Sequence, residues 1–300
     1  MDLRDLAPPL GSGVFPPPRF LPPLLDNGVR GARSWTGLTY AFVPGYRPLT
    51  LDLHRPIHAN GPVPLVIWIH GGGWIEGDRR YVPLQWGQQT LFDKVVAAGM
   101  AVATVDYRLL AEAPFPACVH DCAAALRYLR HHSPELGLNP ERVGVWGESA
   151  GAQLAAMIAF LGSRRYVEAS LVGSLGVGAG SLGTSAAVLF YGPDQMETIA
   201  EEENGLHGLG AFDGERELVR QMAPIEQVHG DIPPVLLMHG DADGVVGVEH
   251  SRRLHQALQA AGVHATLEVT PGADHCFLGT PIEPHLDRAV SFLGQHLLAR

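Results

Sequence analysis

Residues 142–151 read Arg-Val-Gly-Val-Trp-Gly-Glu-Ser-Ala-Gly, and this stretch decides the fold of the chain. Residues 142–146 alternate β-branched or aromatic side chains with small ones, which predicts a short buried strand. The run from Ala150 to Leu161 contains mostly strong helix formers, and Gly162 is expected to end that helix. Between them lies a G-x-S-x-G pattern, whose glycines lack the Cβ atoms that would clash at a sharp strand-to-helix corner. Such a corner would present Ser149 at the carboxyl edge of a sheet as a candidate nucleophile.

The charge and composition of the chain narrow the classes of function. The 300 residues carry a formal net charge of −10 and no run of basic residues, which argues against nucleic acid or an anionic membrane as partners. Lys94 is the only lysine, so Schiff-base or Ser–Lys chemistry is not expected. The length and the apolar content suit one large α/β domain.

The cysteines and the N-terminus bear on the cellular compartment. Three cysteines are too few and odd in number for a disulfide framework. The first residues are charged and are followed by prolines, unlike a secretory signal peptide. No segment approaches the ~20 apolar residues of a membrane span. We therefore expect a cytoplasmic protein without a membrane partner.

The order of strand-like and helix-like segments predicts the architecture. Residues 1–30 form a proline-rich tail, and residues 31–300 are expected to form the domain. Because strands alternate with helices, we expect an α/β fold: a mostly parallel, eight-stranded sheet with helices on both faces. Residues 192–227 lose strand character and are expected to form a small cap insertion. The predicted strands are residues 39–43, 49–54, 64–69, 101–106, 142–146, 186–191, 235–239 and 265–270. Helices are expected over about 84–98, 116–131 and 150–161, and two more are expected later: one that ends at about residue 261 and one that begins at about residue 284.

Several polar groups are expected to gather around Ser149. A serine hydroxyl needs a base that a third group orients, and His275, just after the last strand, is the imidazole placed for that role. Asp241 and Asp243 both follow a strand and lie between serine and histidine in chain order, so both qualify as the orienting carboxylate. An oxyanion would need backbone N–H donors, which the Gly71–Gly73 run and Ala150 can supply.

The chain resembles α/β-hydrolases of the hormone-sensitive-lipase-like and bacterial ferulate-esterase-like carboxylesterase groups. The resemblance extends from about residue 39 to the C-terminus. It implies that the triad acid is Asp243 and that Gly72, Gly73 and Ala150 supply the oxyanion donors. The matching segments are His-Gly-Gly-Gly-Trp at 70–74, Asp-Tyr-Arg-Leu at 106–109, Gly-Glu-Ser-Ala-Gly at 147–151, His-Gly-Asp-Ala-Asp at 239–243 and Asp-His at 274–275.

Other residues near these motifs have simpler interpretations. We expect His70 to shape the glycine loop and Asp106 and Arg108 to form a buried pair that supports it. Glu148 and Trp74 are tentative members of a substrate pocket, although packing or structural roles are open for both. No histidine or cysteine spacing indicates a metal, and no glycine pattern indicates a nucleotide cofactor, so neither is expected.

The sequence thus predicts a serine carboxylesterase that forms an acyl-enzyme on Ser149 and hydrolyses small-molecule esters with short acyl chains or small aryl groups. The alternatives are an amidase, peptidase or aryl-formamidase with the same triad, or a non-catalytic ligand-binding protein on the same scaffold. An intact Ser149–Asp243–His275 set favours an enzyme. The assembly state stays open, with a homodimer among the options.

Overall fold

The protein is built around one eight-stranded sheet in the order β1-β2-β4-β3-β5-β6-β7-β8. The structure is a computed structural model that describes residues 28–80, 82–87, 89–164, 169–178, 180–195 and 220–298. The predicted tail up to residue 27 and most of the predicted cap insertion lie outside the described residues. The strands are β1 (Ala32–Ala41), β2 (Leu49–Pro56), β3 (Val63–Ile69), β4 (Ala101–Val105), β5 (Leu138–Glu148), β6 (Ala186–Phe190), β7 (Val235–Gly240) and β8 (Ala265–Thr270).

The direction of the strands sets where the loops gather. β1 and β2 form an antiparallel hairpin, and β2 also runs antiparallel to β4. From β4 onward all neighbours are parallel, so the carboxyl ends of β3, β5, β6, β7 and β8 meet at one edge of the sheet. The predicted mostly parallel, eight-stranded sheet is confirmed.

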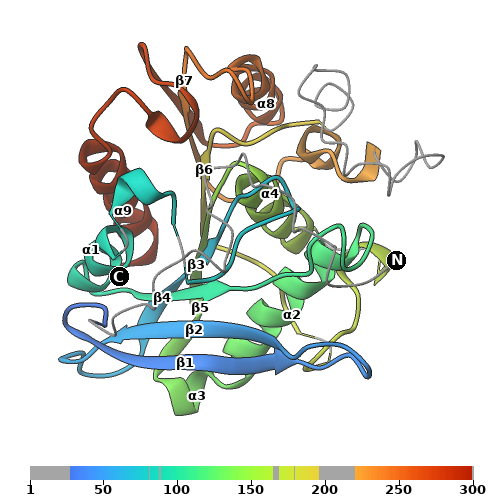
Figure 1. Ribbon diagram of the computed structural model, residues 1–300, viewed down its shortest axis with the longest axis vertical. Coiled ribbons are helices and arrows are strands. Elements are labelled where there is room, and N and C mark those ends of the chain that lie inside the picture. Colours follow the sequence, from blue (N-terminus) through green and yellow to red (C-terminus); the bar gives the residue numbers. More distant parts are fainter. Residues whose placement is uncertain are drawn as a thin grey trace, which may run out of the picture.

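Helices cover both faces of the sheet, as expected (Figure 1). Alternate residues of β3 point to opposite faces: Leu65 and Ile67 join the core beneath one helical layer, and Val66 and Trp68 join the other. Because both faces are covered, β3 is buried along its whole length. One layer contains α2 (Ala117–His131), α4 (Ala150–Gly162) and α8 (Glu249–Ala260), and the other contains α1 (Thr90–Ala97) and α9 (Glu283–Leu297).

The nucleophile helix α4 lies deepest in the core. Its residues are buried from Ala150 to Leu161, so it is apolar all round rather than amphipathic. Its small alanine side chains allow the helix to approach the sheet closely, and its contacts to β5 and β6 fix it above the centre of the sheet. The predicted end at Gly162 agrees with the structure.

Some predicted boundaries differ from the structure. The expected helix over residues 84–98 is divided into a short 3-10 helix η3 (Leu84–Trp86) and α1, because Gly87 has a positive φ of 75° that ends the first helical turn. A short helix α5 (Ala169–Val172) lies in the segment predicted to be a loop. β1 begins at Ala32, seven residues before the predicted start at residue 39, because its first part is an exposed edge without a clear hydrophobic pattern.

The described part of the predicted cap insertion consists of residues 192–195 and 220–227. It includes the 3-10 helix η5 (Pro224–Gln227), which packs against α4 and α8. Among the helices that the structure describes, none combines the length and the apolar character needed to cross a bilayer.

The expected pairing of Asp106 with Arg108 is wrong. Arg108 instead forms a forked pair with Asp121 of α2, with Nη2 2.7 Å from Oδ1, and its backbone N–H also donates to Asp121. Asp106 faces the other way and accepts hydrogen bonds from Arg79. Asp106 and Arg108 thus contact different parts of the fold although they are only two residues apart. Their closeness in sequence therefore did not indicate their ion-pair partners.

We predict that Asp121→Ala destabilises the fold by about 3–5 kcal/mol, because it leaves the mostly buried Arg108 guanidinium without its counter-ion. The matched control is Glu249→Ala, which removes a carboxylate from Arg252, in a pair whose two side chains are 63% and 44% exposed. That exposed pair should contribute at most about 1 kcal/mol. Urea denaturation of both variants measures the difference, and equal losses would contradict the prediction.

Candidate active site

Ser149 occupies a strained corner between β5 and α4. Its φ of 54° and ψ of −124° lie outside the regions that L-residues normally adopt. The corner is possible because its flanking glycines have no side chains: a Cβ on Gly147 would lie 2.1 Å from the Gly151 carbonyl oxygen, and one on Gly151 would lie 2.1 Å from that of Ile69. The Ser149 N–H donates to Phe190 O at 2.9 Å, which ties the corner to the end of β6.

The structure brings the three predicted triad residues into one hydrogen-bonded chain. Ser149 Oγ lies 3.1 Å from His275 Nε2, and His275 Nδ1 lies 2.8 Å from Asp243 Oδ2. Because the Asp243 carboxylate only accepts, the arrangement assigns the hydrogen to Nδ1 of His275 and leaves Nε2 free to accept from the serine hydroxyl. This is the geometry that a general base requires.

Burial and hydrogen bonding act on Asp243 in opposite directions. Burial alone would raise the pKa of this carboxyl, but donors from His239, His275 and the Val246 amide hold its pKa well below the ordinary value. Asp243 Oδ1 accepts the Val245 and Val246 amides at 2.9 and 2.8 Å, which leaves Oδ2 for the imidazoles. Asp243 is therefore ionised when His275 needs a counter-charge.

The other aspartate of the turn, Asp241, binds a backbone amide instead of the imidazole. Asp241 Oδ1 accepts the Gly272 amide at 2.6 Å, so it links its turn to the loop of His275. Asp274 adds a second link, because its Oδ1 accepts both the Gly244 amide at 3.0 Å and the His275 amide at 2.7 Å. Asp241 and Asp274 thus hold the two loops together, while only Asp243 reaches the imidazole.

The glycine run after β3 forms a tight loop beside the serine corner. Gly72 and Gly73 both have positive φ, 91° and 59°, and a Cβ on Gly72 would lie 2.2 Å from Glu76 O. Within the described part of the chain, neither amide donates a hydrogen bond to another residue. Ala150 begins α4, where the first N–H groups have no partner inside the helix. All three predicted oxyanion donors therefore remain candidates.

Glu148 and Trp74, the tentative pocket residues, are both buried side chains bonded to protein groups. Glu148 Oε1 accepts the Gly71 amide at 2.6 Å, and Trp74 Nε1 donates to Gln153 Oε1 at 3.1 Å. Burial raises the pKa of Glu148 to about 7, although the nearby His275 and the Gly71 amide lower it in part. Their burial favours support of the glycine loop over direct contact with a substrate.

His70 packs against Tyr107 at the base of the glycine loop. The two rings are stacked with centroids 4.4 Å apart, and His70 Nδ1 lies 2.9 Å from Gly71 O. The Tyr107 hydroxyl donates to the carbonyl oxygens of His70 and Gly71, both at 3.0 Å. Burial lowers the pKa of His70, which fits a neutral residue that shapes the loop.

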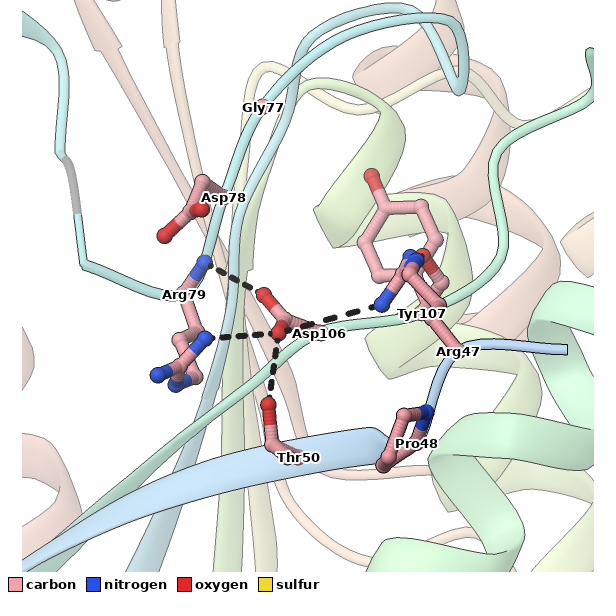
Figure 2. A pocket seen from close by; sticks show the side chains of 8 residues that line it. All are labelled: Arg47, Pro48, Thr50, Gly77, Asp78, Arg79, Asp106 and Tyr107. Carbon is pink, nitrogen blue, oxygen red and sulfur yellow. Dashed lines mark hydrogen bonds and ion pairs between the residues drawn. The ribbon is translucent and has the colours of Figure 1, made fainter. Parts of the chain in front are cut away.

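A polar pocket of about 370 Å³ lies beside the segment that continues from the glycine loop (Figure 2). In it, Asp106 accepts the Arg79 amide at 2.9 Å and Arg79 Nη1 at 2.8 Å, and Thr50 Oγ1 donates to it at 3.0 Å. The dashed contacts in the figure converge on this one carboxylate. Asp106 thereby anchors the end of the loop that begins at Gly71.

Sequence reasoning missed three supporting residues: Arg79, Asp121 and His239. Arg79 and Asp121 find partners through the fold, and nothing in the local sequence pointed to these pairs. His239 stands in the matched His-Gly-Asp-Ala-Asp segment, which could have singled it out. In the described ranges, no group of three or more His, Cys, Asp or Glu side chains is placed to hold a metal ion.

Comparisons with known proteins agree on one family. The BD-FAE family model matches residues 51–258. A probable isoprenylcysteine alpha-carbonyl methylesterase of Arabidopsis thaliana is 26% identical over 254 residues, which cover 79% of this chain and 51% of that protein. An acetyl esterase of Salmonella schwarzengrund is 27% identical over 252 residues, 82% of this chain and 75% of that protein. This chain spans about half the length of several curated relatives that it matches.

A solved structure described as a truncated form of carbohydrate esterase from gut microbiota is similar to the whole fold. It superposes with a TM-score of 0.74 at 26% sequence identity and covers 89% of this chain and 97% of its own. The likeness therefore extends over most of this chain.

The raised pKa of Glu148 predicts a pH-dependent stability. Between the ordinary value of 4.5 and about 7, the unfolded chain releases this proton while the folded protein keeps it, so stability falls as pH rises through that window. Glu148→Gln should remove this slope, on the order of 3 kcal/mol between pH 4.5 and 7. Urea denaturation of both proteins across that range measures it, and parallel pH profiles would contradict the prediction.

Proposed function

This chain belongs to the BD-FAE family of α/β-hydrolase-fold carboxylesterases, and we propose that it hydrolyses short-chain or small aryl esters through an acyl-enzyme on Ser149. The family match and the similar solved structures confirm the predicted resemblance and the α/β-hydrolase fold. The observation that carries the proposal is the continuous hydrogen-bonded chain from Asp243 through His275 to Ser149, at a corner next to glycine amides that donate to no other group among the described residues.

The proposed reaction has two halves. In acylation, Ser149 Oγ attacks the ester carbonyl while His275 Nε2 takes its proton, and the tetrahedral adduct collapses as His275 returns that proton to the leaving alkoxide. In deacylation, His275 takes a proton from water, which attacks the acyl-enzyme, and then gives it back to Ser149. Asp243 holds the imidazole in the required tautomer and balances its positive charge in each half.

Charge that develops on the carbonyl oxygen needs fixed donors. The amides of Gly72, Gly73 and Ala150 are the proposed ones, because they lie beside the corner and the first two have no acceptor among the described residues. Two contacts fix the start of the loop that carries the two glycines: Glu148 accepts the Gly71 amide, and the Tyr107 hydroxyl donates to Gly71 O. Donors held in this way need not reorganise when charge appears.

Two observations support a preference for short acyl groups. The Salmonella relative that covers most of this chain is an acetyl esterase. In sequence, the predicted cap insertion at 192–227 combines the acidic run at 201–203 with several glycines, unlike the large apolar face of an interfacial lid. A small pocket gains roughly 0.8 kcal/mol for each methylene that it buries and nothing beyond its depth. An amidase or formamidase would use the same triad, but the named relatives described above are esterases.

We predict hydrolysis of p-nitrophenyl esters with acyl chains of about two to six carbons, without a rise in rate at the critical micelle concentration. Ser149→Ala should lose about 10⁴–10⁶-fold in kcat, because it removes the nucleophile. The measurement is kcat/KM from acetate to palmitate, with methyl ferulate and an aryl formamide included. Full activity of the folded Ser149→Ala variant, or a maximum at long chains with interfacial activation, would refute the proposal.

The two aspartates of the turn supply a matched pair. Asp243→Asn should reduce kcat by about 10⁴-fold, because the amide can donate to His275 and favour the wrong tautomer. Asp241→Asn should cost far less, since an asparagine oxygen can still accept the Gly272 amide. Both variants are assayed on p-nitrophenyl acetate, and similar losses would mean that Asp243 is not the triad acid.

A further inference from the structure

Asp243 has a second imidazole partner. His239, in the last part of β7, is fully buried, and its Nε2 lies 3.3 Å from Asp243 Oδ2, the same oxygen that His275 Nδ1 contacts at 2.8 Å. Both histidines therefore contact the same carboxylate oxygen, His239 from the end of β7 and His275 from the loop after β8. The proposed mechanism assigns no task to His239.

The partners of His239 determine which nitrogen carries its hydrogen. Nε2 lies 2.8 Å from Val246 O, and a carbonyl oxygen only accepts, so Nε2 is the donor. Nδ1 lies 2.7 Å from Ser251 Oγ of α8, a hydroxyl that can donate to it. The Nε2–H of the ring is thus directed at Val246 O and, at longer range, at Asp243 Oδ2.

The contacts of His239 close the turn around Asp243. Val246 is bonded twice, because its amide donates to Asp243 Oδ1 at 2.8 Å and its carbonyl accepts from His239. Ser251 fixes the ring from α8, and β7 fixes its backbone. One imidazole therefore sets both the path of the turn and the environment of the oxygen that His275 uses.

We propose that His239 is a positioning residue of the catalytic chain, which holds the Asp243 turn through Val246 and shares Asp243 Oδ2 with His275. This inference rests on the proposed esterase function. When His275 becomes an imidazolium, a carboxylate that already has a second N–H partner attracts it less strongly and is a weaker proton acceptor. His239 thereby moderates the charge that His275 faces, and keeps the proton on His275 ready for transfer to the leaving group.

Two substitutions separate this role from simple packing. His239→Gln places an amide N–H near the position of Nε2 and keeps the donor toward Val246 and Asp243. His239→Asn is shorter, and its amide reaches only the position of Nδ1, next to Ser251. The control is His54→Asn: His54 is another buried histidine bonded through Nδ1 to a serine, Ser34, at 2.8 Å, but it lies on β2, far along the sheet from β7.

The expected result is a selective loss in His239→Asn. Its kcat on p-nitrophenyl acetate should fall about 10- to 100-fold with little change in KM, because the turn that carries Asp243 loses a fixed point. The Val245 and Val246 amides still hold Asp243, so its full charge now faces His275, and the acid limb of kcat/KM should move to higher pH by about 0.5–1 unit. His239→Gln should recover most of both changes, and His54→Asn should show neither.

The pH profile is interpretable because the groups around His275 are known. They are Asp243, Glu148, Tyr191, whose ring centroid lies 4.7 Å from that of His275, and the adjacent Asp274 and Cys276. His239 contacts Asp243, and its ring centroid lies 6.5 Å from that of Tyr191. A movement of the acid limb to lower pH, with a loss as large as that of Asp243→Asn, would mean that Asp243 has left His275 and would overturn the sharing of Oδ2. Wild-type rates and an unmoved limb in folded His239→Asn would overturn the whole inference.

A measurement without substrate separates this inference from the proposed function. The downfield proton NMR resonance of His275 Nδ1–H reports its bond to Asp243 whether or not the enzyme turns over. We expect it to shift in His239→Asn and to stay at the wild-type position in His54→Asn. An absence of esterase activity in the wild type would refute the proposed function alone, while an unchanged resonance in His239→Asn would refute the role of His239.

Discussion

The close approach of the α4 N-terminus to the end of β3 is the contact on which the rest of the site depends. It is possible only because Gly151 has no side chain, since a Cβ there would lie 2.1 Å from Ile69 O and 2.4 Å from His70 O. This contact brings the glycine loop after β3 next to Ser149 and turns the serine into an unfavourable backbone conformation. Packing of the buried helix α4 must therefore offset the strain at the nucleophile.

The loops around this contact are held by polar groups rather than by apolar packing. Glu148 fixes the start of the glycine loop, Asp106 fixes its continuation through Arg79, and Asp241 and Asp274 join the loops of the acid and the base. Each of these carboxylates accepts backbone amides, which determine a loop path more narrowly than a nondirectional apolar contact does. The donors and acceptors of the site are thereby placed before any ligand arrives.

The sequence predicted the fold and the principal site residues because both depend on local patterns. Ser149 lies in a strand-corner-helix signature, and His275 follows the last strand, so each could be located without knowledge of the fold. The choice between Asp241 and Asp243 needed the family pattern, because both follow β7 and only the three-dimensional turn shows which one reaches the imidazole. The supporting partners could not be predicted, since pairs such as Arg108 with Asp121 join the segment after β4 to α2, which only the folded chain brings together.

Two of the carboxyl groups around His275, Asp243 and Glu148, differ in a way that separates their roles. Asp243 has several N–H donors and a pKa well below its ordinary value, so it carries a negative charge at neutral pH. Glu148 accepts the Gly71 amide within a buried site that raises its pKa to about 7, so much of it is neutral at and below that pH. A second full charge beside His275 would make the imidazole more basic and slower to return its proton. Burial of Glu148 therefore lets it support the glycine loop while Asp243 alone supplies most of the counter-charge.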